Sequence, residues 1–268
     1  MKTIAKILLC TVIAATTLVA LPALAAVEGK EVTYNAGETK LKGYLAWDSA
    51  LKGKVPGVLV VHEWWGHNDY ARKRARMLAE LGYVALAVDM YGDGKQANHP
   101  KEAGMFAAMV NKSKGVSEAR FNAAADFLKK QPQTDASRLA AIGYCFGGGV
   151  VLHMARSGAD LKGVASFHGS LGTDTPAPLG AIKAKIFVAN GAADSFTPPD
   201  VVGAFASEMA KAEADFRFFN YAGALHSFTN PDADDYAKRF DMPLAYNAAA
   251  DRRSWDELKA FLREIFAP

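Results

Sequence analysis

The sequence predicts a single α/β domain with a mostly parallel sheet, helices on both faces of the sheet and an antiparallel hairpin at its N-terminal edge. From Val55 onward, short and continuously apolar segments alternate with longer helical patterns, as expected for parallel strands covered on both faces. Before that point, alternating stretches at 30–35 and 40–47 flank Ala36-Gly37, which is the pattern of a hairpin. The 268 residues contain no repeat, low-complexity segment or linker that would divide the domain.

The first 25 residues are predicted to be a secretory signal peptide, which leaves a domain at 26–268. Lys2 and Lys6 precede an apolar run that ends near residue 21, and the small-residue sequence Ala23-Leu24-Ala25 follows it. The run is shorter than the ~20 residues that a membrane anchor needs. We therefore expect cleavage after residue 25 or 26 and a periplasmic or secreted mature protein.

Cleavage would leave Cys145 as the only cysteine, because Cys10 lies inside the apolar run. A lipidation site is not expected at Cys10, since bulky Leu9 precedes it. The formal charge of +3 falls to +1 without Lys2 and Lys6, which argues against an electrostatic nucleic-acid or membrane surface. We expect a small-molecule partner, no nucleic acid and no stable membrane insertion; the oligomeric state stays open.

Strands and helices are predicted in turn along the rest of the chain. Apolar runs predict strands at 57–62, 84–89, 139–144, 163–167, 185–190 and 216–221. Helical patterns cover 69–81, 100–130, 147–157, 200–212 and 246–266. The segment 98–130 exceeds an ordinary helix and contains Gly104 and Gly115, so we expect two helices with a break. Packing on the sheet is the favoured arrangement for this segment, and a lid is the alternative.

The most informative motif is a cysteine flanked by glycines between an apolar strand and a helix. Gly143 and Gly147 lie two residues before and two after Cys145, as a very tight turn requires. The helix begins directly after the cysteine, so its unpaired amides and its dipole would stabilise a thiolate and an oxyanion. This pattern is a nucleophile elbow with cysteine in place of serine, and Phe146 N–H is an expected oxyanion donor.

Two other interpretations of this motif stay open. A dinucleotide-binding loop is disfavoured, because Cys145 stands where the fingerprint needs its second glycine. A buried cysteine that only packs is the other alternative, since free cysteine is among the most buried residue types.

An acid and then a histidine follow the cysteine, which is the chain order of the α/β-hydrolase fold. Asp194 and His226 each come after a later predicted strand. Asp194 would hold one imidazole nitrogen so that the other can take the proton of the Cys145 thiol. Asp200 is the alternative acid, although its position favours the start of the next helix. The sequence thus predicts an α/β-hydrolase fold and a Cys-His-Asp triad.

The remaining histidines are assigned other places. His168 ends a strand beside the expected site and is predicted to line the pocket, whereas His153 and His99 are predicted to be structural. His62 and His67 superficially resemble a zinc-protease motif, but a spacing of five residues with a glycine between them would not share a helix face. We therefore expect no metal at this motif.

Over essentially the whole mature chain, the sequence resembles the dienelactone hydrolase family. The motifs that carry the resemblance are Val60-Val61-His62-Glu63-Trp64-Trp65-Gly66, Val88-Asp89-Met90-Tyr91-Gly92, Gly143-Tyr144-Cys145-Phe146-Gly147-Gly148, Gly191-Ala192-Ala193-Asp194 and His226-Ser227-Phe228. The resemblance implies a carboxylic ester hydrolase with its triad at Cys145, His226 and Asp194 and with no cofactor. It also implies that Glu63 interacts with the thiol and controls when it becomes nucleophilic, with Trp64 N–H as the second oxyanion donor.

Five residues are predicted to contact the substrate: Trp65, Tyr91, Lys95, His168 and Phe228. The resemblance also implies two arginines that bind the carboxylate of dienelactone, but this chain has Asp93 and Asn230 at those places. Lys95 could replace the first arginine, whereas Asn230 cannot form a charged bidentate clamp. The chemistry of the family therefore transfers better than its substrate.

We expect the Cys145 thiolate to attack an ester, lactone or thioester carbonyl of a small molecule and water to release the acyl-enzyme. The rival function is non-enzymatic small-molecule binding or redox sensing, with Cys145 as an oxidisable thiol. An intact acid and base favour the enzyme, because a sensor needs only an exposed thiol of low pKa.

Overall fold

The computed structural model describes residues 26–112 and 115–267 of the chain. The predicted signal peptide lies outside the described residues. In the described part, the chain folds into eight strands of one sheet and seven helices. No helix of this part is both long and apolar enough to cross a membrane.

The sheet is mostly parallel and has its antiparallel strands at the N-terminal edge, as predicted. The strands are β1 (Val27–Ala36), β2 (Thr39–Asp48), β3 (Val55–Val61), β4 (Val84–Val88), β5 (Thr134–Tyr144), β6 (Gly163–Phe167), β7 (Lys185–Gly191) and β8 (Phe216–Tyr221). Their spatial order is β1-β2-β4-β3-β5-β6-β7-β8. The hairpin of β1 and β2 joins β4 antiparallel, and all pairs from β4 to β8 are parallel.

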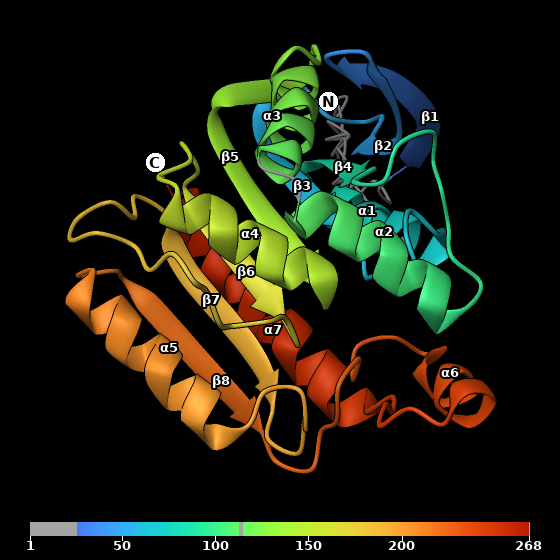
Figure 1. The fold of residues 1–268 in the computed structure, drawn as a ribbon. Coiled ribbons are helices and arrows are strands. Elements are labelled where there is room, and N and C mark those ends of the chain that lie inside the picture. The colour runs from blue at the N-terminus through green and yellow to red at the C-terminus, as the bar shows by residue number, and fades with distance from the viewer. Residues whose placement is uncertain (1–25, 113–114, 268) are drawn as a thin grey trace, which may run out of the picture.

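Helices cover both faces of the sheet, which confirms the predicted layering (Figure 1). The helices are α1 (Asp69–Glu80), α2 (Pro100–Lys112), α3 (Val116–Lys129), α4 (Phe146–Arg156), α5 (Pro199–Lys211), α6 (Ala233–Phe240) and α7 (Ala248–Ile265). α1 and α7 pack on one face, where their apolar side chains form one core cluster. α3, α4 and α5 pack on the other face and form a second cluster.

The central strand β3 shows why the core strands read as continuous apolar runs. Val58 and Val60 contribute to the core under α1 and α7, whereas Leu59 and Val61 contribute to the core under α3 and α4. All four side chains are fully buried. Burying an aliphatic side chain of this size contributes about 1.5–3 kcal/mol, so a strand between two helical layers has no place for polar residues.

The predicted segment 98–130 is two helices, as expected, but the break is at only one of the two glycines. Gly115 precedes α3 with φ at 76°, in the left-handed region that glycine adopts without strain. Gly104 lies inside α2. α3 packs on the sheet, which is the favoured of the two arrangements. α6, which no sequence pattern predicted, packs Tyr236 and Phe240 against Trp65.

Because β3 and β5 to β8 run parallel, their carboxyl ends meet at one edge of the sheet. The loop after each of these strands carries a candidate site residue: Glu63 after β3, Cys145 after β5, His168 after β6, Asp194 after β7 and His226 after β8. This edge is where open α/β sheets bind their ligands.

Candidate active site

Cys145 occupies the tight turn that the glycines predicted. Its backbone has φ at 52° and ψ at −114°, a strained conformation for a residue with a side chain, between the end of β5 and the start of α4. A Cβ atom on Gly143 would lie 1.9 Å from the carbonyl oxygen of Gly147, and one on Gly147 would lie 2.3 Å from that of Val61. Both glycines are therefore required by the close approach of neighbouring backbone.

The strained turn is held by its backbone. Cys145 N–H donates to the carbonyl of Phe167, at the end of β6, with an N···O distance of 3.0 Å. Gly148 N–H donates back to the carbonyl of Cys145 at 3.0 Å. These bonds fix the cysteine at the N-terminus of α4, where unpaired amides and the helix dipole favour negative charge.

His226 and Asp194 lie together, as their order in the chain predicted. His226 Nδ1 lies 2.8 Å from Asp194 Oδ2, and both residues are buried. Asp194 Oδ1 also accepts from the backbone N–H of Phe196 at 2.9 Å, which fixes the carboxylate. Asp200, the alternative acid, is exposed in the first turn of α5, and the carboxylate that is hydrogen-bonded to His226 is that of Asp194.

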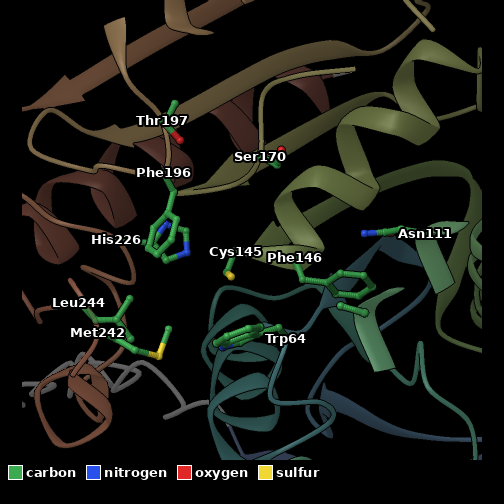
Figure 2. Close-up of a pocket in the computed structure, with 11 residues that line it drawn as sticks. Trp64, Asn111, Cys145, Phe146, Ser170, Phe196, Thr197, His226, Met242 and Leu244 are labelled. Carbon is green, nitrogen blue, oxygen red and sulfur yellow. The ribbon is translucent and has the colours of Figure 1, made fainter. Parts of the chain in front are cut away.

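The charge state of His226 is tied to that of Cys145. Figure 2 shows the imidazole and the thiol facing each other across the mouth of the site. Burial lowers the pKa of His226, but a negative charge on Cys145 and the hydrogen bond with Asp194 outweigh it and raise the pKa to about 10. The site thus favours the imidazolium form of His226.

Glu63 is buried next to this pair and is held by the loop that carries His226. Its Oε1 accepts from Ser227 Oγ at 2.9 Å, and its Oε2 accepts from Asn230 Nδ2 at 2.6 Å. Burial raises the pKa of the carboxyl group, and the two hydrogen bonds oppose this shift. Among the described residues, no hydrogen bond joins Glu63 to the thiol, so the expected contact between them is not formed in this structure.

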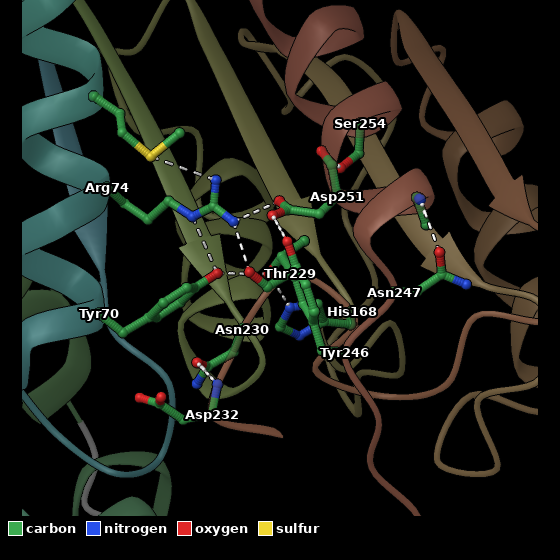
Figure 3. A network of polar contacts seen from close by, with 12 residues as sticks. Tyr70, Arg74, His168, Thr229, Asn230, Asp232, Tyr246, Asn247, Asp251 and Ser254 are labelled. Atoms are coloured by element: carbon green, nitrogen blue, oxygen red, sulfur yellow. Dashed lines mark hydrogen bonds and ion pairs between the residues drawn. The ribbon is translucent and has the colours of Figure 1, made fainter. Parts of the chain in front are cut away.

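A buried polar network anchors the same loop from behind (Figure 3). Arg74 of α1 donates to the backbone carbonyl of Thr229 at 2.7 Å and forms an ion pair with Asp251 at 2.6 Å. The Thr229 hydroxyl lies 2.5 Å from Tyr70 Oη and 2.8 Å from His168 Nε2. Sequence reasoning missed this network, because its members come from separate elements and no spacing joins them.

The two residues predicted to donate to the oxyanion, Phe146 and Trp64, both lie close to Cys145: Phe146 follows it in sequence, and Trp64 lines the same cavity. Phe146 is the first residue of α4, so its N–H has no acceptor within the helix. Trp64 lies in the turn after β3 that Gly66 N–H closes on the carbonyl of Glu63 at 3.1 Å. Both residues line the same cavity as Cys145.

That cavity has a volume of about 410 Å³ and contains both Cys145 and His226. Its remaining walls are mostly apolar and come from six loops and helices. The other residues that line it are Trp64, Ala107, Asn111, Phe146, Ser170, Phe196, Thr197, Met242 and Leu244. No lysine, arginine or carboxylate is among these lining residues, so the walls favour an uncharged ligand.

The five residues predicted to contact the substrate are not among those that line the cavity. Trp65 is buried and stacks on Tyr236 of α6, with ring centroids 4.3 Å apart. Tyr91 is buried and donates its hydroxyl to the carbonyl of Trp64 at 3.0 Å. Lys95 is exposed on the loop after β4.

His168 and Phe228 form the layer directly behind His226. The rings of His168 and His226 meet edge to face with centroids 5.3 Å apart, and Phe228 contacts the other side of His168. Burial, and then the positive charges of His226 and Arg74, lower the pKa of His168 well below its usual value. A neutral His168 therefore supports the catalytic histidine candidate from behind and does not contact a ligand in the cavity.

The histidines of the zinc-like motif are structural. His62 Nε2 accepts from the backbone N–H of Met90 at 3.2 Å, so its Nδ1 carries the proton and donates to the carbonyl of Glu63 at 2.5 Å. Burial lowers the pKa of His67 to about 4. Within the described ranges, no group of three His, Cys, Asp or Glu side chains is placed to hold a metal ion.

Comparisons with known proteins show the family to which the chain belongs. A family model described as the dienelactone hydrolase family matches residues 41–266. A putative carboxymethylenebutenolidase of Aquifex aeolicus is 28% identical over 77% of this chain and 90% of its own, and the protein usf of Aquifex pyrophilus is 29% identical over 88% and 98%. A crystal structure of a dienelactone hydrolase-like promiscuous phosphotriesterase from metagenomic libraries is 35% identical, with a TM-score of 0.85 over 90% of this chain and all of that one.

Proposed function

The chain belongs to the dienelactone hydrolase family, whose members hydrolyse esters and lactones, and we propose that it does so through a covalent intermediate on Cys145. One observation carries the proposal. Cys145, in a strained turn at a helix N-terminus, lines the same cavity as His226. His226 is hydrogen-bonded to the buried carboxylate of Asp194 at 2.8 Å.

In the proposed reaction, the Cys145 sulfur attacks the carbonyl carbon while His226 holds the thiol proton. The negative charge that develops on the carbonyl oxygen is stabilised by the backbone N–H groups of Phe146 and Trp64. Collapse of this intermediate breaks the bond to the leaving oxygen, which takes its proton from His226. Asp194 keeps the imidazole in the orientation that both transfers need.

Water then completes the cycle. His226 removes a proton from a water molecule, the hydroxide attacks the thioester carbonyl, and the acid leaves as the thiolate of Cys145 is restored. Glu63 lies close enough in the fold to act on the same centre, since Ser227 ties it to the residue next to His226. We propose that Glu63 modulates the thiol when substrate disturbs these hydrogen bonds.

We propose an uncharged ester, lactone or thioester as the substrate. The lining of the cavity supports this choice, because no lysine or arginine lines it and its one cationic side chain, His226, is used by the reaction. The two residues at the places of the family's arginines do not supply a cation either: Asp93 is exposed, and Asn230 is bound to Glu63 at 2.6 Å. Lys95 is exposed and outside the cavity.

A second candidate activity is hydrolysis of a neutral phosphotriester. It is favoured by the similarity to the promiscuous phosphotriesterase together with an uncharged cavity around a nucleophile. Release of p-nitrophenol from diethyl p-nitrophenyl phosphate, with Cys145→Ala as the control, tests this activity directly.

The proposed export follows from the N-terminal sequence of two lysines, an apolar run and Ala23-Leu24-Ala25. We propose that the mature enzyme begins at Ala26 or Val27 and acts in the periplasm or outside the cell. Intact-mass analysis of periplasmic material would give the mature mass. A species that still carries Met1 would contradict the proposed processing.

The decisive experiment for the reaction is a panel of p-nitrophenyl esters, assayed with the wild type, Cys145→Ala and His226→Ala. The proposal expects turnover in the wild type only, with an initial burst of p-nitrophenol if deacylation is slow. Turnover that survives in Cys145→Ala would refute the nucleophile. Reversible oxidation of Cys145 without turnover of any ester or lactone would favour the rival redox sensor.

A further inference from the structure

A second cavity adjoins the first and is not explained by the reaction itself. It has a volume of about 340 Å³ and shares Asn111, Phe146 and Ser170 with the cavity that contains Cys145. Its other walls come from α3, α4 and the loop after β6, and they are rich in polar side chains. The two cavities therefore meet at these three shared residues, with mostly apolar walls around the nucleophile and polar walls beyond Phe146.

The position of His226 decides which part of a substrate enters the second cavity. In Figure 2, His226 and Leu244 lie on one side of Cys145, and Phe146 and Asn111 lie on the other. The proposed reaction has His226 deliver a proton to the leaving oxygen, so the leaving group must lie on the His226 side. The acyl chain then extends past Phe146 and Asn111 into the second cavity.

The chemistry of the second cavity is that of a hydrogen-bond acceptor. Glu118 of α3 and His153 of α4 both line it, and Glu118 Oε1 lies 2.6 Å from His153 Nε2. This hydrogen bond lowers the pKa of Glu118, so the carboxylate is ionised at neutral pH. The carboxylate of Glu118 lines the cavity, and its side chain is 36% exposed, so a ligand can reach it.

The one arginine that lines this cavity does not offset that negative charge. Arg156 forms a bidentate pair with Glu208, with both N···O distances at 2.8 Å, and donates to the carbonyl of Leu171 at 2.7 Å. Its guanidinium is thus occupied by partners that are buried with it. An acyl chain that ends in a carboxylate would meet the charge of Glu118, and the described residues that line this cavity include no other lysine or arginine to bind it.

We propose that the second cavity is the subsite for the far end of the acyl group, and that Glu118 selects acyl chains ending in a hydrogen-bond donor, a hydroxyl or an ammonium group. This inference rests on the proposed function, because it takes the direction of the acyl chain from the role of His226. It makes Glu118 a specificity-determining residue at a distance from the reacting atoms.

The test uses ethyl esters that share one leaving group and differ only at the end of the acyl chain. The set is hexanoate, 6-hydroxyhexanoate, 6-aminohexanoate and the monoester of adipic acid, with the butanoate and octanoate homologues of each to cover the reach of the cavity. Initial rates are followed by proton release for the wild type, Glu118→Gln and the control Glu80→Gln. Glu80 is exposed at the end of α1 and lines neither cavity.

The subsite predicts kcat/KM for the amino ester about fivefold above that of the alkyl ester, because an exposed ion pair contributes up to ~1 kcal/mol and tenfold needs ~1.4 kcal/mol. The esters should differ in KM rather than in kcat, and the ester with a terminal carboxylate should have the lowest kcat/KM. Glu118→Gln should remove the preference for ammonium, whereas Glu80→Gln should keep it.

Equal rates for all chain ends at every length, or an unchanged preference in Glu118→Gln, would overturn the subsite while leaving the esterase intact. Hydrolysis of none of the esters by the wild type would overturn the proposed function itself. The two failures are therefore distinguishable in one set of measurements.

Discussion

Replacing Arg74 by methionine should destabilise the fold and slow the reaction together, because Arg74 joins α1 to the loop of His226. Its side chain is 4% exposed, that of its partner Asp251 is 16% exposed, and they lie 2.6 Å apart. Removing one member of a buried ion pair costs about 3–5 kcal/mol, since it leaves the other charge uncompensated. The partial exposure of Asp251 lets water solvate it, so we expect a loss near ~3 kcal/mol.

The assay is a double-mutant cycle of urea denaturation with Arg74→Met, Asp251→Asn and the combined variant. Each single substitution should lower the free energy of unfolding, and the combined variant should cost less than the sum, because neither charge is then left alone. The combined variant still leaves the Thr229 carbonyl without its donor at 2.7 Å, so it should not recover fully.

Kinetics of the same variants test whether the network positions the site. At urea concentrations below the unfolding transition, Arg74→Met should lower kcat by about tenfold, or ~1.4 kcal/mol, and change KM little. The reason is that Arg74 holds the loop of His226 and does not line the cavity. A loss of stability below ~1 kcal/mol would contradict the buried pair, and an unchanged kcat would make the network purely structural.

Three further outcomes are expected. Because the pKa of His226 is raised to about 10, its imidazolium accompanies Cys145 at neutral pH. Alkylation of Cys145 by iodoacetamide at pH 7 should therefore be slower in His226→Ala than in the wild type, and equal rates would contradict the pair. Gly143→Ala should fail to fold, since its Cβ would lie 1.9 Å from a backbone oxygen, whereas Gly104→Ala, with nothing within 4 Å, should fold and melt at the same or a higher temperature. Neutral esters should exceed acidic esters of equal size in kcat/KM, and a preference of more than about tenfold for the acidic ester would reveal a cation that binds it.

The central strands could be predicted closely because a strand that is buried on both faces is a continuous apolar run in the sequence. β6 and β8 begin and end where their apolar runs do. The predicted strand at 139–144 is five residues shorter than β5, which begins at Thr134. The first half of β5 is mostly polar, and only Thr134 and Asp135 of that half pair with β3. The pairing shifts register between Pro56 and Gly57, and an irregularity of this kind leaves no period in the sequence.

α6 was missed for a related reason. It has eight residues and is mostly polar, and its apolar side chains meet only a small cluster around Trp65. Short helices of this kind depend on tertiary contacts rather than on propensity.

The candidate site could also be predicted only in part. Cys145, Asp194 and His226 could be placed because the fold fixes which strand ends carry them. The structure brings Cys145 and His226 to one cavity, with Asp194 hydrogen-bonded to His226. The lining could not be predicted from motif neighbours. Trp65 adjoins Trp64 in sequence, but alternate residues of a turn point in different directions, and Trp65 packs under α6 instead. Of the residues that do line the cavity, Met242 belongs to a loop without any motif, and Phe196 lies two residues beyond the motif that ends at Asp194.

Asn230 shows how one position can keep a structural role and lose a binding role. Where the family resemblance leads one to expect an arginine, Asn230 still donates to Glu63 at 2.6 Å and thus keeps the loop of His226 tied to the end of β3. An amide carries no charge, so Glu63 has no cation bonded to it, and burial raises the pKa of its carboxyl group. The same change removes the positive charge that would attract a carboxylate substrate. The cavity around the nucleophile accordingly has no lysine or arginine in its lining, and the carboxylate of Glu118 lines the cavity beyond it.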